Sequence, residues 1–234
     1  MRRSQQWQLA FGLILTSFAN AAAHPNQTAA SLTVKVKDYA NVDARTLVEA
    51  ERIATKVYEN VGVKIKWSNL DQVSSSGSAD PKGEDLTALS VLQVHILTEE
   101  MANMLGMPGD VMGLAPGKGP GRRLVYLFYP FVKKLAQRQV GGETRANPLK
   151  FAAVAQILGE MMAHELGHVL LNLPSHSPTG IMKGDWDLVD LWNVSYGSLL
   201  FTKEQAEAIR REVARRNGTI SAIQETTPGD MVAK

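Results

Sequence analysis

Two histidines and one glutamate stand at the spacing that a catalytic metal site requires. The segment from Met162 to His168 reads Met-Ala-His-Glu-Leu-Gly-His, an H-E-x-x-H pattern inside a predicted helix. Residues four apart lie on one face of a helix, so His164 and His168 can bind one metal ion together. Glu165 lies one step around the helix, where its carboxylate can hold a water molecule without binding the metal. Two imidazoles beside a carboxylate suit Zn²⁺.

A third histidine follows the predicted end of this helix. Pro174 cannot continue a helix, and Asn172 tolerates the left-handed backbone that often closes one, so the helix should end near Leu171. After that reversal His176 can approach the metal. The two remaining histidines lie in the N-terminal leader and in a predicted strand. We therefore expect His176 to be the third metal ligand.

Carboxylates are the main alternative for the third ligand. Gluzincin peptidases use a glutamate from a later helix, and aspzincins use an aspartate, although the full aspzincin motif is absent here. The candidate acids downstream are Glu204, Glu207, Asp185, Asp187 and Asp190. We favour His176, because a histidine directly after a helix stop and before Gly-Ile-Met is the more specific pattern.

Three short pieces of this region resemble the metzincin zinc peptidases and are similar to matrixin motifs. They are His164-Glu165-Leu166-Gly167-His168, His176-Ser177 and Gly180-Ile181-Met182. The stretch Ser-His-Ser-Pro-Thr-Gly-Ile-Met looks closer still to that of small secreted bacterial proteins, which also carry it after H-E-x-x-H. The resemblance implies that Met182 is the Met-turn residue, packing as an apolar floor beneath the metal.

The chain also departs from the usual metzincin pattern, H-E-x-x-H-x-x-G-x-x-H. Leu171 stands where that pattern has Gly, and Pro174 where it has the third His. His176 therefore comes two residues late, and Asn172 must turn the chain. Several metzincins use a tyrosine beyond the Met-turn to stabilise the oxyanion, and Tyr196 is a weak candidate for that role.

These residues predict a secreted zinc endopeptidase that acts on peptide or protein substrates. Zinc on the three histidines would lower the pKa of its bound water to about 7. Glu165 would accept that water's proton as general base and pass a proton to the leaving amine. The alternative from another class is a non-catalytic, zinc-containing domain that binds peptides. Glu165 favours catalysis, because a structural zinc site needs a fourth ligand rather than a poised carboxylate.

The chain as a whole is typical of an exported protein. Residues 1–23 read as a signal peptide, with two arginines, a short apolar run and Ala-Ala-Ala before His24. Its removal lowers the Lys and Arg count from 25 to 23, equal to the 23 acids, which argues against nucleic acid or stable membrane association. The sequence has no cysteine. We expect a monomer, secreted or periplasmic, with a peptidase domain at 24–216 and a flexible tail at 217–234.

Alternating strands and helices predict an α+β fold. The expected strands are 32–36, 63–67, 89–97 and 123–128, with a surface loop at 70–87. The expected helices begin after Asp43, at Asn147-Pro148 and at the capping box 202–205, the last ending near Arg216. The metzincin resemblance implies a twisted mixed sheet, an active-site helix and a smaller C-terminal subdomain. It also implies an antiparallel edge strand at 112–115, which can bind an extended peptide.

Overall fold

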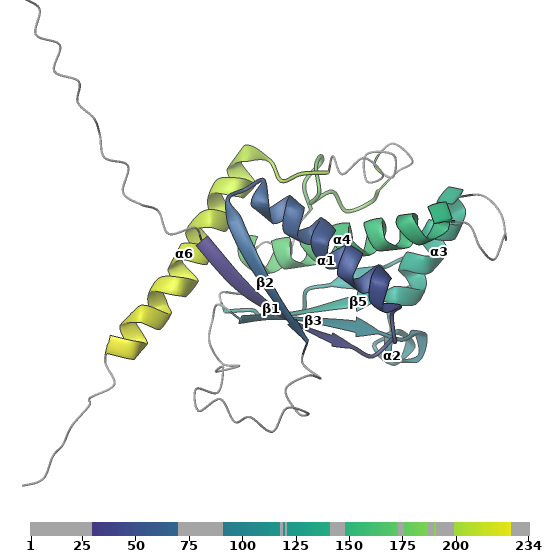
Figure 1. The fold of residues 1–234 in the computed structure, drawn as a ribbon, viewed down its shortest axis with the longest axis horizontal. Helices are drawn as coiled ribbons and strands as arrows, with labels where there is room; N and C mark the ends of the chain where they lie inside the picture. The colour runs from purple at the N-terminus through teal and green to yellow at the C-terminus, as the bar shows by residue number, and fades with distance from the viewer. Residues whose placement is uncertain are drawn as a thin grey trace, which may run out of the picture.

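A five-stranded mixed sheet forms one layer of the molecule (Figure 1). This computed structural model describes residues 30–69, 91–117, 119, 121–140, 148–172, 176–186, 190 and 199–225. The strand order is β2-β1-β3-β5-β4. The strands are β1 (Ala30–Asp38), β2 (Val63–Asn69), β3 (Val91–Leu97), β4 (Gly113–Leu114) and β5 (Leu124–Phe128). All neighbours are parallel except β4, which is antiparallel to β5 and forms the edge. The predicted edge strand is confirmed.

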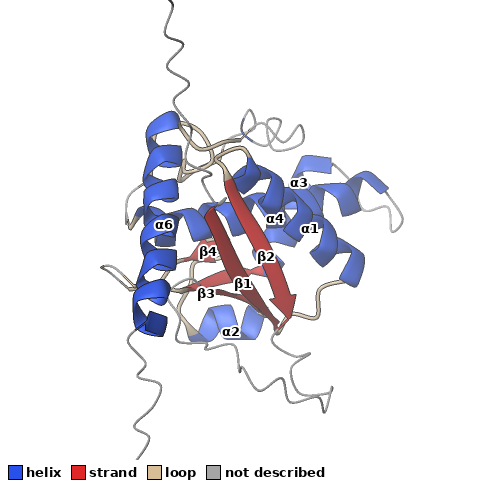
Figure 2. Ribbon diagram, turned by 60° about the vertical axis from the view of Figure 1, so that its left-hand side comes forward, coloured by secondary structure: helices blue, strands red, loops and turns tan. Residues whose placement is uncertain are grey.

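Helices α1, α3 and α4 lie together on one side of this sheet (Figure 2). The helices are α1 (Ala44–Glu59), α2 (Glu99–Met104), α3 (Tyr129–Val140), α4 (Pro148–Leu171) and α6 (Lys203–Glu225). Beyond α4, the described part of the chain adds a turn region and α6 but no further strand of the sheet. The predicted α+β class, with a mixed sheet and a long helix that carries H-E-x-x-H, is confirmed.

Local signals in the sequence set the ends of several helices. The Asp43 carboxylate accepts hydrogen bonds from the Arg45 and Thr46 amides and so caps α1. Asn172 adopts a φ of 53°, the left-handed conformation expected where α4 stops. Helix α6 runs to Glu225, past the end expected near residue 216. A single glycine, Gly218, does not stop it, because glycine inside a helix costs only about 1 kcal/mol.

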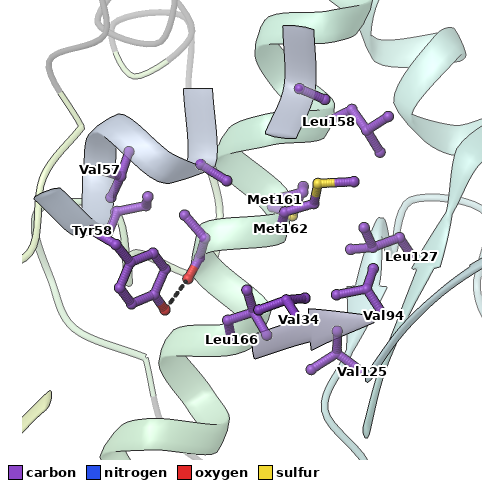
Figure 3. Close-up of a cluster of buried hydrophobic side chains, with 14 of the residues drawn as sticks. Val34, Val57, Tyr58, Val94, Val125, Leu127, Leu158, Met161, Met162 and Leu166 are labelled. Atoms are coloured by element: carbon purple, nitrogen blue, oxygen red, sulfur yellow. Dashed lines mark hydrogen bonds between the residues drawn. The ribbon is translucent and has the colours of Figure 1, made fainter. Parts of the chain in front are cut away.

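The core lies between the sheet and α4, with α1 packed across that helix (Figure 3). Figure 3 shows side chains from all three layers: Val34, Val94, Val125 and Leu127 from the strands, Leu158, Met161, Met162 and Leu166 from α4, and Val57 and Tyr58 from α1. The Tyr58 hydroxyl donates a 3.1 Å hydrogen bond to the Ala163 carbonyl. Each large apolar side chain buried in this way stabilises the fold by about 1.5–3 kcal/mol. The core therefore fixes the position of α4, the helix that carries the H-E-x-x-H motif.

Close approach of α1 to α4 depends on one glycine. A β-carbon at Gly159 would lie 2.6 Å from the Ala50 carbonyl oxygen and 2.8 Å from the Ile53 β-carbon. Neither the backbone of α1 nor its buried Ile53 can move away easily, so only glycine allows the two helices to pack at this distance. The site helix is thereby held from the side opposite its histidines.

Several sequence-based expectations fall on parts that the structure does not describe. The signal peptide at 1–23, the loop at 70–87 and the last part of the tail, 226–234, lie outside the described residues. They stay predictions. None of the described helices is both long enough and apolar enough to cross a membrane.

Candidate metal centre

The two helix histidines point their ring nitrogens toward each other. His164 and His168 follow one another on the same face of α4, are 3% and 7% exposed, and have ring centroids 4.7 Å apart. Their Nε2 atoms are separated by 3.1 Å. Two nitrogens bound to one tetrahedral zinc at about 2.0–2.1 Å lie roughly 3.3 Å apart. The pair has the spacing that a shared zinc ion needs.

A backbone carbonyl fixes which nitrogen of His164 carries the proton. The ring's Nδ1 lies 2.6 Å from the Ile181 carbonyl oxygen, which can only accept, so Nδ1 donates and Nε2 keeps its lone pair. Burial lowers the pKa of His164 to about 4, which keeps the imidazole neutral at physiological pH. A neutral imidazole with a fixed tautomer is the form that binds a metal.

His176 comes to the same place from the turn after α4. Its ring centroid lies 5.3 Å from that of His164 and 4.9 Å from that of His168. One ligand nitrogen from each of the three histidines lies within 4.8 Å of the others. His176 is exposed, whereas the two helix residues are buried. Three imidazole nitrogens that converge from two elements fit Zn²⁺.

The turn that carries His176 is held by backbone hydrogen bonds and by a glycine. The Ser177 amide donates to the Met182 carbonyl at 2.8 Å, and the Lys183 amide donates to the Gly180 carbonyl at 3.1 Å. A β-carbon at Gly184 would lie 2.6 Å from His176 Nδ1. Position 184 must therefore stay free of a side chain for the imidazole to keep its place.

Met182 packs directly beneath the metal-binding motif. It is 1% exposed, and a β-carbon at Gly167 would lie 2.6 Å from its sulfur and 2.9 Å from Phe201 Cε1. Gly167 stands between the two helix histidines in sequence, so the sulfur reaches the helix just where the site is built. The Ile181 amide donates to the Leu200 carbonyl at 3.0 Å and ties this floor to the segment before α6.

Glu165 lies in the same buried region, on the side of the edge strand. It is 4% exposed, and burial raises the pKa of its carboxyl to about 8. Its side chain packs against Gly113 of β4. An acid, an open strand edge and three nitrogen donors therefore come together around one end of α4.

The other acids and the remaining described histidine have different partners. Among the described residues, the group of side chains able to hold a metal contains the three histidines and no carboxylate. The Thr202 hydroxyl donates a 2.9 Å hydrogen bond to the Glu204 carboxylate at the start of α6. The Asp190 carboxylate forms an ion pair with the Lys183 ammonium at 2.5 Å. His95 lies in β3, with its ring 5.7 Å from that of Tyr39. Asp187 and Tyr196 lie outside the described residues.

One contact to the site could not be predicted from the sequence. The Arg122 guanidinium donates to the carbonyls of Ala115 at 3.3 Å, Gly117 at 3.1 Å and His168 at 2.5 Å. It therefore ties the segment that follows β4 to the last turn of α4. The bond from Arg122 to the His168 carbonyl joins residues 46 positions apart, and no motif around Arg122 predicts it.

Comparison with known proteins gives similarity to a solved structure but to no protein family. No protein-family model and no curated protein matches the chain. The solved structure of the archaemetzincin from Methanopyrus kandleri is similar at 19% sequence identity and a TM-score of 0.42, over 80% of this chain and 98% of that one. At this TM-score the two backbones agree only in coarse outline. The interpretation of the site therefore rests on the H-E-x-x-H motif and on the geometry of the three histidines.

Proposed function

We propose that this chain is a zinc-dependent endopeptidase of the metzincin type. The observation that carries the proposal is the convergence of His164, His168 and His176, whose ligand nitrogens lie within 4.8 Å of one another. Glu165 directly follows His164 on the helix that bears two of these ligands. Three histidines leave a zinc coordination position open, which is the arrangement of a catalytic rather than a structural site.

The three imidazoles would bind the zinc ion, and the buried Glu165 carboxyl would accept and donate protons. Zinc bound there would polarise a water molecule and the peptide carbonyl, and its charge would keep Glu165 ionised. Glu165 would take a proton from the attacking water and deliver one to the leaving amine. The Ile181 carbonyl would hold the His164 ring in orientation through Nδ1, which lies 2.6 Å away.

The edge strand would give an extended peptide substrate a place to bind. Strand β4 pairs with β5 on one side and ends the sheet on the other. An extended peptide can add to such an edge through main-chain hydrogen bonds, with its side chains alternating between the two faces. Because Glu165 packs against Gly113 of this strand, a peptide bound along β4 would pass close to the proposed base.

The second candidate function is a zinc-containing domain that binds peptides without cleaving them. It would use the same three ligands and the same strand edge. The position of Glu165 favours catalysis, because a buried carboxyl with a raised pKa, next to a metal ligand in sequence, suits a general base, whereas a purely structural zinc site needs a fourth ligand instead.

A first experiment combines metal analysis with digestion of a peptide library. The purified chain should contain one zinc per molecule and cleave internal peptide bonds. The Glu165→Ala variant should keep its zinc but lose about 10²- to 10⁴-fold in kcat, the range that a general base contributes. A zinc-loaded parent that cleaves nothing would favour the binding function. A Glu165→Ala variant as active as the parent would overturn the assigned base.

We also propose that the protein is exported, on the basis of residues 1–23. The mature form should begin at His24 or Ala22, which N-terminal sequencing of the protein from the extracytoplasmic fraction would show. An exported chain that keeps Met1 and stays bound to the membrane would contradict this.

A further inference from the structure

We propose that Gly113 in the edge strand is a positioning residue that sets where the Glu165 carboxyl lies. The proposal rests on the proposed function in assigning Glu165 as the base, but its packing argument stands on geometry alone. A β-carbon at position 113 would lie 2.5 Å from Glu165 Oε1, 2.6 Å from Cγ and 2.7 Å from Cδ. Such approaches are far inside ordinary van der Waals contact, so no side chain fits there while Glu165 keeps its place.

The backbone does not require glycine at this position. Gly113 is absent from the described residues with positive φ, so alanine can adopt its conformation, and alanine is better suited to an extended strand than glycine. The three atoms nearest to the added β-carbon all belong to Glu165. What excludes a side chain is therefore the glutamate.

The register of the sheet aims position 113 at the site helix. Gly113 pairs with Leu127 across the antiparallel ladder, and paired residues share a face of the sheet. Leu127 is fully buried in the cluster that includes Met162 and Leu166 of α4 (Figure 3). The next residue, Leu114, instead packs in the cluster around Phe131. The missing side chain at 113 leaves the space that the Glu165 carboxyl fills.

Strand β4 cannot yield to make room for a larger residue. The Phe128 amide donates to the Met112 carbonyl at 2.8 Å, which fixes the start of β4 to β5. On the other side, Arg122 bonds both the Ala115 carbonyl, at 3.3 Å, and the His168 carbonyl, at 2.5 Å. The strand is thus anchored both to the sheet and to the helix that bears Glu165. A substitution at 113 must displace the end of the glutamate side chain.

The test compares Gly113→Ala with a matched control in the same segment. A β-carbon at Gly109 would have one neighbour within 4 Å, Phe131 Cε1 at 3.8 Å, which is an ordinary van der Waals contact, so Gly109→Ala makes the same chemical change without a clash. Gly113→Ala should lower kcat about 100-fold, the effect of a misplacement of about 1 Å, with KM changed less than about threefold and zinc content unchanged. Gly109→Ala should match the parent. Parent-like kcat in Gly113→Ala, or a loss confined to KM, would overturn the proposal.

A shortened acid separates displacement of Glu165 from damage to the strand. In a Glu165→Asp background the carboxylate is one methylene shorter, so adding Gly113→Ala should cost much less than it does in the parent. An equal fold-loss in both backgrounds would place the effect on the strand and refute the positioning role. If Gly113→Ala alone fails to fold, folding of the double variant would support the proposal, and failure of both would overturn it.

Crystal structures of the parent and of Gly113→Ala give a readout that needs no activity. The Glu165 carboxyl should move by about 1 Å or more while β4 and the three histidines stay in place. An unmoved carboxyl would refute the inference. If the parent cleaves no peptide, the proposed function fails, and these two structures still decide whether Gly113 positions Glu165.

Discussion

The candidate metal centre combines two regions that are held in place by different means. His164 and His168 belong to α4, whose opposite face packs on α1 and on the sheet. His176 belongs to the turn at 176–186, is exposed, and keeps its place through short backbone bonds and the absence of a side chain at Gly184. The positions of His164 and His168 are set by the packing of α4 in the core of the protein, whereas the position of His176 depends on a few local contacts.

The two regions meet at the peptide of Ile181. Its carbonyl accepts the bond from His164, its amide bonds the Leu200 carbonyl, and its neighbour Met182 packs under Gly167. One residue of the turn thus orients a helix ligand while the next supports the helix from below. Because of this connection, substitutions at the exposed turn positions His176 and Gly184 should alter the site without unfolding the core.

The largest expected effect is the loss of zinc binding when either kind of ligand is removed. His164→Ala and His176→Ala should each lower zinc affinity by more than the 10- to 100-fold typical of an outer-shell partner. The metal-free proteins should differ: His164→Ala loses a buried hydrogen bond to the Ile181 carbonyl and should unfold at lower temperature, while His176→Ala, at an exposed position, should not. Equilibrium zinc titration and thermal unfolding measure the two effects.

Glu204→Ala and Glu207→Ala are the controls for this comparison. Neither belongs to the group of converging ligand atoms among the described residues, so both variants should bind zinc like the parent. A collapse of affinity in one of them, together with normal affinity in His176→Ala, would instead indicate a site of the gluzincin type.

A smaller effect is expected when the turn is changed without touching a ligand. In Gly184→Ala the new β-carbon would lie 2.6 Å from His176 Nδ1 and 2.8 Å from its Cγ. The exposed imidazole should move away, and zinc affinity should fall about 10- to 100-fold, as for other residues that orient a ligand. Gly218→Ala on α6, where a β-carbon meets nothing within 4 Å, is the control. Unchanged affinity in Gly184→Ala would show that the turn adapts more freely than its contacts suggest.

The same contrast explains what could be predicted from the sequence. The helix ligands follow from spacing alone, since i and i+4 share a face. The helix stop at Asn172 and the capping box, in which the Thr202 amide donates to Gln205 Oε1 at 2.9 Å, follow from local chemistry. Helix α2 lies outside the predicted elements, although the Thr98 hydroxyl accepts a hydrogen bond from the Met101 amide and caps it.

Contacts between segments distant in sequence could not be predicted in this way. No sequence pattern around Gly113 predicts that the Glu165 side chain will occupy the space beside it, where a β-carbon would otherwise lie. No pattern around Arg122 predicts its hydrogen bond to the His168 carbonyl. Both depend on how the edge strand packs on α4, which is decided by the whole sheet. Helix α3 lies outside the predicted elements for a related reason: it directly follows β5 and packs on α4, a segment distant in sequence.

The smallest expected effect concerns a buried acid one turn before His164. Glu160 is fully buried, its Oε1 accepts a bond from Gln156 Nε2 at 3.1 Å, and its Oε2 has no partner. Burial raises the pKa of this carboxyl to about 8. Between pH 4.5 and about 8 the folded chain therefore keeps a proton that the unfolded chain releases, so the free energy of unfolding should fall as pH rises through that window.

Metal-free protein above pH 6.5 gives the cleanest measurement of this effect. Below that pH His164, whose pKa burial lowers to about 4, has the opposite influence, because its folded state binds the proton less tightly than the unfolded state and stability rises with pH. From pH 6.5 to 8 the parent should lose stability through Glu160 and Glu165, both with pKa values of about 8. Glu160→Gln should show a shallower decline in denaturant unfolding, and Glu160→Gln combined with Glu165→Gln should be nearly flat. If the free energy of unfolding of the parent does not fall from pH 6.5 to 8, or falls equally in Glu160→Gln, then Glu160 finds a compensating partner. The helix region would then be less rigid around its buried acids than its contrast with the exposed turn implies.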